Sequence, residues 1–193
     1  MKKILLLSPH PDDIELSMGG NLFKLAKNYI THVYLFNNCD IKDEFKQSMN
    51  LLNSDYYIDR SCKLRYFYKD RQLILNRLFN LKVQFQPDIV FCPSLDDTHQ
   101  DHKVIAEEAY RAFKNTTLIS YIHPQNCRDI RPNYFVELSE SEINKKIELL
   151  SVYKSQQHRN YFSKEAITGT AAFYGAMTGR KYCEAFEALR MFE

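Results

Sequence analysis

Short apolar runs alternate with helix-periodic segments through the first two thirds of the chain, and this alternation limits the fold more than any other feature. The run at 3–8 contains Ile-Leu-Leu-Leu without a polar break, which is typical of a strand covered on both faces. Parallel neighbouring strands need a crossover between them, so the alternation predicts an α/β, Rossmann-like parallel sheet flanked by helices. Strands are expected at 3–8, 33–36, 64–68, 87–93 and 117–121, with helices around 22–28, 45–52, 71–84 and 102–114.

The pattern becomes less regular beyond Pro132. Residues 134–138 predict a strand, and the following Ser-Glu-Ser-Glu is a capping box that opens a helix. Residues 155–178 lack clean periodicity, which favours a mobile loop with one further short element, and a last helix is expected at 181–192. Because no repeat, low-complexity tract or Gly/Ser linker divides the chain, one domain over 1–193 is predicted.

Composition argues against several classes of protein. The 26 Lys and Arg residues nearly balance the 24 Asp and Glu residues, which disfavours a nucleic-acid partner. No run approaches the ~18 apolar residues of a membrane span, and the N-terminal residues do not resemble a signal peptide. The 5 cysteines form no Cys-x-x-Cys pair, so reduced thiols and a cytoplasmic protein are expected. A homo-oligomer is compatible with the aromatic-rich C-terminal third.

Polar side chains gather directly after two of the predicted strands. Ser-Pro-His-Pro-Asp-Asp follows the first strand, and Asp-Asp-Thr-His-Gln-Asp-His follows the fourth. Ligands of parallel sheets collect at the carboxyl ends of strands, so these two segments predict the functional site. Two imidazoles and one carboxylate suit zinc and leave a fourth position for water. We therefore expect one Zn²⁺ per chain, held by His10, Asp13 and His102.

The remaining polar groups of these segments suit acid–base chemistry. Asp12 lies beside a predicted ligand and is suited to act as the general base that accepts a proton from the attacking water. His99 lies two residues before Asp101, whose carboxylate is expected to keep the imidazole positively charged, so that it stabilises an oxyanion and protonates a leaving amine. Together these roles describe metal-assisted hydrolysis of an acyl bond with an amine as leaving group.

Two motifs carry a resemblance to a known family. His10-Pro-Asp-Asp-Ile-Glu-Leu-Ser-Met-Gly-Gly20 and Asp97-Thr-His-Gln-Asp-His102 resemble the signatures of the LmbE/PIG-L family of zinc-dependent N-deacetylases. The resemblance continues through 87–93 to Lys-Ser-Gln at 154–156 and so covers most of the chain. It implies the same three zinc ligands, Asp12 as general base, and His99 with Asp101 as the charged acid or oxyanion pair.

The resemblance also suggests a substrate class. Family members remove acetyl groups from N-acetylglucosamine-type sugars, so a small amino-sugar conjugate is the expected substrate. Asp70 and Arg71 resemble the family's substrate-contacting pair, and an arginine there is suited to hold a carboxylate or phosphate. Ile14 replaces the usual glutamate and Glu15 follows it, as in the branch that resembles bacillithiol-pathway deacetylases.

Several alternatives stay open at this point. The same machinery could remove a formyl group or cleave another amide of a sugar derivative, and a non-catalytic metal-dependent binding module is the rival from another class. Gly19 and Gly20 are interpreted as allowing close approach of a helix, because no phosphate-binding pattern accompanies them. His123 is interpreted as a hydrogen-bonded loop residue, Glu184 as the partner of a surface cation, and Cys92 as a core residue.

Overall fold

Seven strands form one sheet in the computed structural model, which describes residues 1–37, 41–129 and 131–192. Their order across the sheet is β3-β2-β1-β4-β5-β7-β6. The strands are β1 (Lys3–Ser8), β2 (Ile30–Asn37), β3 (Asp55–Cys62), β4 (Ile89–Pro93), β5 (Thr117–Tyr121), β6 (Tyr134–Glu137) and β7 (Cys183–Arg190). The first five pair in parallel, and β7 runs antiparallel to both β5 and β6. The predicted α/β, Rossmann-like architecture is confirmed, with two antiparallel strands added at one side.

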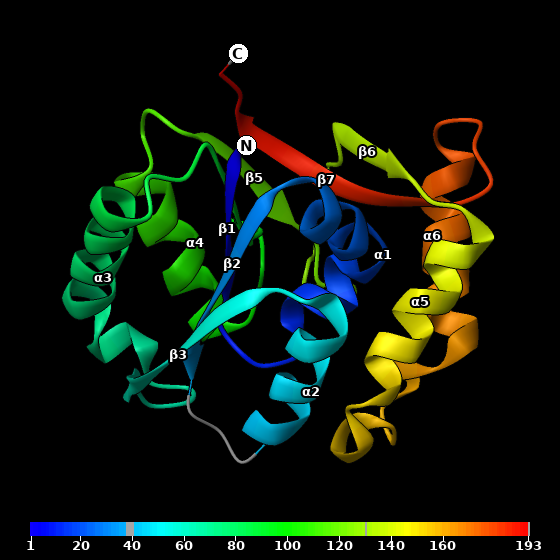
Figure 1. Cartoon of the computed structure of the whole chain (residues 1–193), viewed down its shortest axis with the longest axis horizontal. Helices are drawn as coiled ribbons and strands as arrows, with labels where there is room; N and C mark the ends of the chain where they lie inside the picture. The colour runs from blue at the N-terminus through cyan, green and yellow to red at the C-terminus, as the bar shows by residue number, and fades with distance from the viewer. Residues whose placement is uncertain (38–40, 130, 193) are drawn as a thin grey trace.

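Helices cover both faces of this sheet. They are α1 (Asp13–Asn28), α2 (Lys42–Leu52), α3 (Arg71–Gln84), α4 (Gln100–Ala112), α5 (Glu140–Ser151) and α6 (Lys164–Ala176), with 3₁₀ turns η1 (Phe67–Lys69), η2 (Lys154–Gln156) and η3 (Asn160–Phe162). Figure 1 shows α3 and α4 on one side of the sheet and α1, α2 and α5 on the other. None of the helices in the described part of the chain is both long and apolar enough to cross a membrane.

The central strands supply both halves of the core. In β1, Ile4 and Leu6 pack into the cluster beneath α1, α2 and α5, whereas Leu5 and Leu7 pack into the cluster beneath α3 and α4. Successive side chains of a strand point to opposite faces, so a strand buried on both faces must be apolar at every position. This requirement explains why β1 is an unbroken apolar run.

The connection pattern creates a crevice beside β1. From β1 the chain moves outward through β2 to β3, and from β4 it moves in the other direction to β5. The sheet therefore reverses its direction of winding between β1 and β4, which pair directly from Ile4–Ile89 to Leu6–Phe91. At such a switch point the loops after the two strands separate and leave room for a ligand.

Two of the predicted elements are wrong. The segment 64–68 is not the third strand, because Leu64, Arg65 and Tyr66 are exposed and Arg65 adopts a left-handed φ of 68° that no strand contains. The third strand is β3, an edge strand whose polar residues hide it from a search for apolar runs. The final segment 181–192 is strand β7 rather than a helix, and it lies between β5 and β6, where Cys183–Phe186 is buried.

Other boundaries shift without changing the architecture. Helix α1 begins at Asp13 rather than near residue 22, and it is kinked at Met18, where φ is −140°. The expected capping box is confirmed, since Ser139 Oγ accepts from the Glu142 amide at 3.3 Å and Glu142 Oε2 accepts from the Ser139 amide at 2.8 Å. The irregular segment 155–178 folds into two 3₁₀ turns and the thirteen-residue helix α6.

Candidate metal and active site

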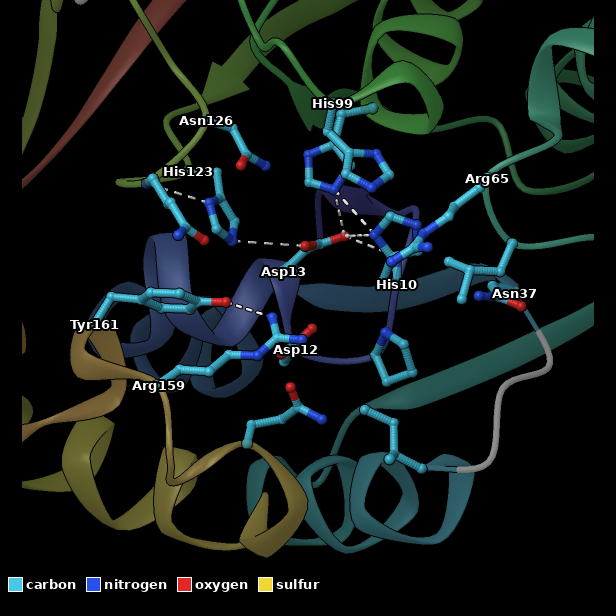
Figure 2. A pocket seen from close by; sticks show the side chains of 16 residues that line it. His10, Asp12, Asp13, Asn37, Arg65, His99, His123, Asn126, Arg159 and Tyr161 are labelled. Carbon is cyan, nitrogen blue, oxygen red and sulfur yellow. Dashed lines mark hydrogen bonds and ion pairs between the residues drawn. The ribbon is translucent and has the colours of Figure 1, made fainter.

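The two polar segments meet where the sheet switches direction. His10, Asp12 and Asp13 follow the end of β1, while His99 and His102 lie at the start of α4 after β4. Figure 2 shows His10, Asp12, Asp13 and His99 converging from separate elements on one cavity, which His102 also lines. The Ser8 hydroxyl donates to the His10 carbonyl at 2.6 Å and so fixes the turn after β1. The predicted convergence of residues from two strand ends is present in the structure.

Three polar atoms in this cluster form a small triangle. His10 Nδ1 lies 3.1 Å from His102 Nε2, His102 Nε2 lies 3.1 Å from Asp13 Oδ2, and His10 Nδ1 lies 3.4 Å from Asp13 Oδ2. Ligand atoms about 2.0–2.1 Å from a tetrahedral zinc ion are separated by about 3.3 Å, so the triangle has the dimensions of one tetrahedral face. Two imidazoles and one carboxylate therefore fit a zinc ion in both chemistry and spacing.

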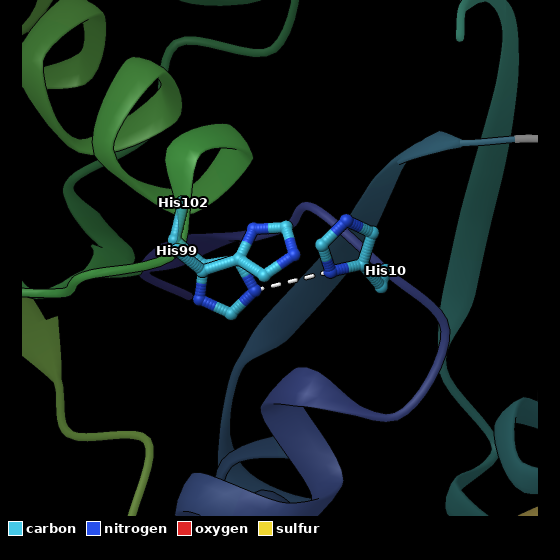
Figure 3. A group of neighbouring side chains, drawn as sticks. All are labelled: His10, His99 and His102. Atoms are coloured by element: carbon cyan, nitrogen blue, oxygen red, sulfur yellow. Dashed lines mark hydrogen bonds between the residues drawn. The ribbon is translucent and has the colours of Figure 1, made fainter. Parts of the chain in front are cut away.

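His99 lies close to the same cluster. One nitrogen from each of His10, His99 and His102 falls within 4.8 Å of the other two. Figure 3 shows the three rings gathered together. The Asp13 carboxylate lies nearer to the other two ligand atoms, so it fits the third ligand position better than His99. This arrangement leaves His99 beside the metal position and facing the cavity.

Each of the two imidazoles has a carboxylate on its far nitrogen. His102 Nδ1 lies 2.8 Å from Asp97 Oδ2, and His10 Nε2 lies 3.1 Å from Asp101 Oδ2. A carboxylate that accepts the remote N–H of a ligand histidine fixes the ring and leaves the other nitrogen unprotonated toward the metal. Asp97 was assigned no role from the sequence, although its position five residues before His102 could have suggested one.

The charges of the cluster are strongly coupled. Although burial opposes its ionisation, His102 and His10 hold the pKa of Asp13 well below its usual range. Burial lowers the pKa of His102, but Asp13 and Asp97 outweigh it and raise this pKa to about 10. Burial and the neighbouring charges of Asp13 and Glu15 raise the pKa of Asp12 to about 8. The site thus concentrates negative charge that a divalent cation would compensate.

Asp101 has a different partner from the one expected. Its carboxylate contacts His10 and also accepts the amides of Arg65 at 2.6 Å and Phe67 at 3.2 Å. Only its backbone N–H reaches His99, donating to Nδ1 at 3.2 Å. Burial, followed by repulsion from His10 and His102, lowers the pKa of His99 to about 4. The structure thus places the Asp101 carboxylate against His10 and the 65–67 turn, and only the Asp101 backbone against His99.

The cavity around the cluster measures about 310 Å³ and has contributors that sequence reasoning missed. His123 lines it after β5, with Nε2 3.9 Å from Asp13 Oδ1 and Nδ1 accepting from the Gln125 amide at 3.4 Å. It is hydrogen-bonded, as expected, but it also faces the metal position. The lining residues that had no predicted role are Asn37, Ile41, Leu64, Arg65, Gln125, Asn126, Gln156, Arg159 and Tyr161.

Asp70 and Arg71 do not line this cavity. Arg71 begins α3, and its guanidinium lies 2.7 Å from Glu107 and 2.5 Å from Glu108 of α4. Asp70 occupies the position just before α3. The structure places this pair between two helices, so their predicted contact with substrate has no support from the geometry of the cavity.

A buried ion pair holds the part of α1 that follows the kink at Met18. Glu184 of β7 accepts the amides of Gly20 at 2.9 Å and Asn21 at 2.8 Å, just beyond the kink in α1, and it pairs with Lys146 at 2.7 Å. Glu184 is 3% exposed, so its interpretation as a surface partner is wrong. A Cβ at Gly20 would lie 2.6 Å from Leu138 Cδ1, which confirms the close helix approach expected at this position.

Comparisons with known proteins show relatives of similar sequence and fold. The chain is 23% identical over 223 residues to diacetylchitobiose deacetylase of Thermococcus kodakarensis (strain ATCC BAA-918 / JCM 12380 / KOD1), covering 95% of this chain and 82% of that protein. The conserved protein TT1542 from Thermus thermophilus superposes with a TM-score of 0.83 at 21% identity, over 100% of this chain and 97% of the other.

The same fold also occurs in a protein named for a different reaction. GalB, the 4-carboxy-2-hydroxymuconate hydratase from Pseudomonas putida KT2440, superposes with a TM-score of 0.77 at 18% identity, over 100% of this chain and 99% of that chain. The fold alone therefore does not fix the reaction, which must be argued from the site.

The sequence model of the PIG-L family, GlcNAc-PI de-N-acetylase, matches residues 5–113, more than half of the chain. This protein thus belongs to the PIG-L family.

Proposed function

We propose that this protein is a metal-dependent N-deacetylase that hydrolyses the acetamide of an N-acetylated amino sugar or its conjugate. The observation that carries the proposal is the triangle of His10 Nδ1, Asp13 Oδ2 and His102 Nε2, whose sides of 3.1–3.4 Å match a face of a zinc tetrahedron. Family membership and the relative named diacetylchitobiose deacetylase support the same reaction class.

The donor set fits a single Zn²⁺ held by His10, Asp13 and His102, with Asp101 and Asp97 orienting the two imidazoles. A zinc ion bound there would supply Lewis acidity, which polarises an amide carbonyl and makes water more acidic. The chain's own groups then have to hold the substrate and move one proton.

Asp12 is the proposed general base, and a divalent cation bound beside it would favour the charged, proton-accepting form against the burial that raises its pKa to about 8. Asp12 lines the cavity directly before Asp13, so its carboxylate lies beside the metal position without being needed as a ligand. Asp12 accepts a proton as the water oxygen forms its bond to the acetyl carbon, and it returns this proton to the nitrogen as the carbon–nitrogen bond breaks. The other proton of the water stays on the new carboxyl group and leaves when that group ionises, so the products are acetate, one proton and a free amine.

His99 is the proposed partner of the developing oxyanion. Because its Nδ1 accepts the Asp101 amide, Nε2 is the nitrogen that carries a proton. A neutral imidazole can donate this N–H to the carbonyl oxygen as negative charge accumulates there. His99 therefore needs no positive charge to perform this role.

Metal content and amine release test the proposal on one preparation. Wild-type protein is expected to bind about one zinc per chain and to release free amine from N-acetylglucosamine conjugates in a metal-dependent way. The variant His102→Ala is expected to lose both properties. Stoichiometric zinc in His102→Ala would contradict the ligand set, and absence of metal even after reconstitution would contradict the catalytic proposal.

The same assay separates the alternatives. Faster release from an N-formyl than from an N-acetyl conjugate would identify a deformylase with the same machinery. Bound metal and bound sugar without any amine release would indicate a binding module.

A further inference from the structure

A second, smaller pocket lies between α1, α5, α6, β7 and the loop after β5. This inner pocket measures about 40 Å³, and its walls combine the apolar side chains of Ile122, Ile167 and Tyr174 with the polar groups of Ser17 and Lys146. All five side chains belong to residues that are at most 8% exposed. A volume of this size has room for about three water-sized groups. The inner pocket can therefore take a small part of a ligand, but not a whole sugar.

The inner pocket adjoins the cavity around the metal position, here called the metal-site cavity. Ser17 follows Asp13 by four residues and so lies about one turn further along α1. His123 lines the metal-site cavity, whereas the next residue, Pro124, lines the inner pocket. Tyr161 lines both spaces, and its ring centroid lies 5.9 Å from that of His123. Figure 2 shows these two rings at the same side of the metal-site cavity. The Tyr161 side chain is thus part of a wall that the two spaces share.

The Ser17 hydroxyl is buried without a hydrogen-bond partner among the described residues. A serine within a helix often donates to the carbonyl four residues earlier, which here belongs to Asp13, but the structure contains no such bond. A buried hydroxyl without a partner costs free energy, and such a group is commonly satisfied by water or a ligand. Because Ser17 lines the inner pocket, this pocket offers a polar group that a bound molecule can satisfy.

The charges that line the inner pocket favour a neutral ligand group. Lys146 Nζ donates to Glu184 Oε1 at 2.7 Å, and an ammonium has further N–H groups to offer. Glu184 neutralises this cation, and its buried carboxylate would repel a second anion. A hydroxyl group fits these neighbours because it can both donate and accept a hydrogen bond. The apolar walls favour a short hydrocarbon chain that carries this hydroxyl.

We propose that the inner pocket binds the far end of an N-acyl group that is about two to three atoms longer than acetyl and ends in a hydroxyl group. Rotation of the partly exposed Tyr161 side chain joins the two spaces, and the acyl hydroxyl then bonds to Ser17. The inference goes beyond acetamide hydrolysis and rests on the proposed deacetylase function for its reaction. The water oxygen again joins the acyl carbon as the carbon–nitrogen bond breaks. The products are a free amine, one proton and the longer carboxylate.

Three glycosides that differ only in their acyl group test the proposal on the zinc-loaded protein. Methyl β-glucosaminide is acylated with acetyl, butanoyl or 3-hydroxypropanoyl, of which the last two have the same length and end in a methyl or a hydroxyl group. Amine release gives kcat/KM for each compound, and isothermal titration calorimetry compares their affinities if no amine is released. We expect the 3-hydroxypropanoyl compound to exceed the acetyl compound by at least about tenfold and the butanoyl compound by at least about threefold, through apolar burial and the bond to Ser17.

Variants of the inner pocket show whether the acyl group enters it. Ser17→Ala is expected to remove most of the advantage of 3-hydroxypropanoyl over butanoyl, and it adds no bulk, so it tests the proposal even if a larger substitution does not fold. Ala171→Leu fills part of the inner pocket and is expected to lower both longer compounds at least about tenfold relative to acetyl. Ala176→Leu makes the same change at an exposed position of α6 outside the inner pocket and should keep the wild-type ratios. Wild-type ratios in Ser17→Ala and Ala171→Leu would overturn the proposal.

The remaining outcomes separate this proposal from the deacetylase function. Amine release that is fastest from the acetyl compound, or equal for all three compounds, overturns the acyl site and supports the deacetylase. Tighter binding of the 3-hydroxypropanoyl compound that depends on Ser17, without amine release, supports the acyl site and contradicts the deacetylase. Absence of both binding and amine release for all three compounds overturns both proposals.

Discussion

Asp97 accepts the Nδ1 proton of His102 at 2.8 Å, and both side chains are almost completely buried. The carboxylate fixes the imidazole with Nε2 turned toward His10 and Asp13. Asp97→Ala should therefore weaken zinc binding by about 10–100-fold, because the ring loses its orientation and basicity. Titration against a competing chelator measures the change, with exposed Asp96→Ala as the matched control. Equal affinity in both variants would contradict this support role.

Substitution of Asp12 should lower the rate of amine release without changing the amount of bound zinc. Asp12→Asn keeps the shape of the side chain but removes its ability to accept a proton, so kcat is expected to fall by about 10²–10⁴-fold with zinc content unchanged. Amine release and metal analysis on the same sample measure both quantities. Full activity in this variant would exclude Asp12 as the base, whereas loss of zinc would make it a ligand.

Removal of Glu184 should destabilise the fold. Glu184→Ala leaves Lys146 and the amides of Gly20 and Asn21 without their buried acceptor. We expect a loss of about 3–5 kcal/mol in the free energy of unfolding of the metal-free protein, measured by urea denaturation. Lys181→Ala breaks an exposed pair with Glu140 and should change this free energy little. Similar losses in both variants would contradict the role of the buried pair.

The same substitution at two glycines of α6 should change the stability of the fold in opposite directions. A Cβ at Gly175 would lie 2.6–2.7 Å from the backbone of Arg180 and Lys181, whereas a Cβ at Gly169 meets nothing within 4 Å. Gly175→Ala is therefore expected to cost about 1–3 kcal/mol through overpacking. Gly169→Ala should stabilise the helix by roughly 0.5–1 kcal/mol. Thermal unfolding compares the two, and a shift of the same sign in both would contradict the close packing of Gly175 against the backbone before β7.

The contribution of Tyr34 should depend on pH. Burial opposes ionisation of Asp59, but hydrogen bonds from Ser61 and from the Tyr34 hydroxyl at 2.7 Å hold its pKa below the usual 3.8. Because the pKa of Asp59 is lowered in the folded state, this stabilisation is present above pH 3.8 and is lost as the pH falls through the folded-state pKa. Tyr34→Phe should cost about 1.5–3 kcal/mol near neutral pH.

Urea denaturation of wild type and Tyr34→Phe at neutral pH and near pH 3 measures this dependence. The difference between the two proteins is expected to shrink at the lower pH, because protonated Asp59 becomes a weaker acceptor. A difference that grew on acidification would show that Tyr34 favours the neutral carboxyl group.

The parallel part of the fold could be predicted because burial on both faces leaves a direct record in the sequence. β1 and β4 are continuous apolar runs, and the helices after them repeat apolar residues at helical spacing. β3 and β7 were not predicted, because their residues do not form the apolar runs of a strand that is buried on both faces. An edge strand tolerates polar residues, as in Asp-Tyr-Tyr-Ile-Asp-Arg-Ser-Cys, and β7 is identified only by the strands on either side of it.

The site residues also divide into those that local sequence patterns reveal and those that only tertiary contacts place. The spacing within a turn brought His10 and Asp13 together, and strand order brought them to His102, so these residues could be found from the sequence. Arg159 enters the cavity through 3₁₀ turns that have no periodic pattern, and Arg65 through a left-handed turn in a segment that resembles a strand. Their positions depend on contacts with distant parts of the chain, which sequence patterns do not record.

The position of β7 in the sheet also determines the order in which parts of the fold can form during translation. β6 is translated well before β7, yet β7 is its neighbour in the sheet, so among the described strands β6 has no partner until residues 183–190 have emerged. Glu184, which binds the α1 amides beyond the metal-ligand turn, arrives on the same strand. A nascent chain without β7 therefore lacks the buried acceptor of these two α1 amides, and α1 gains this contact only after residues 183–190 have been translated.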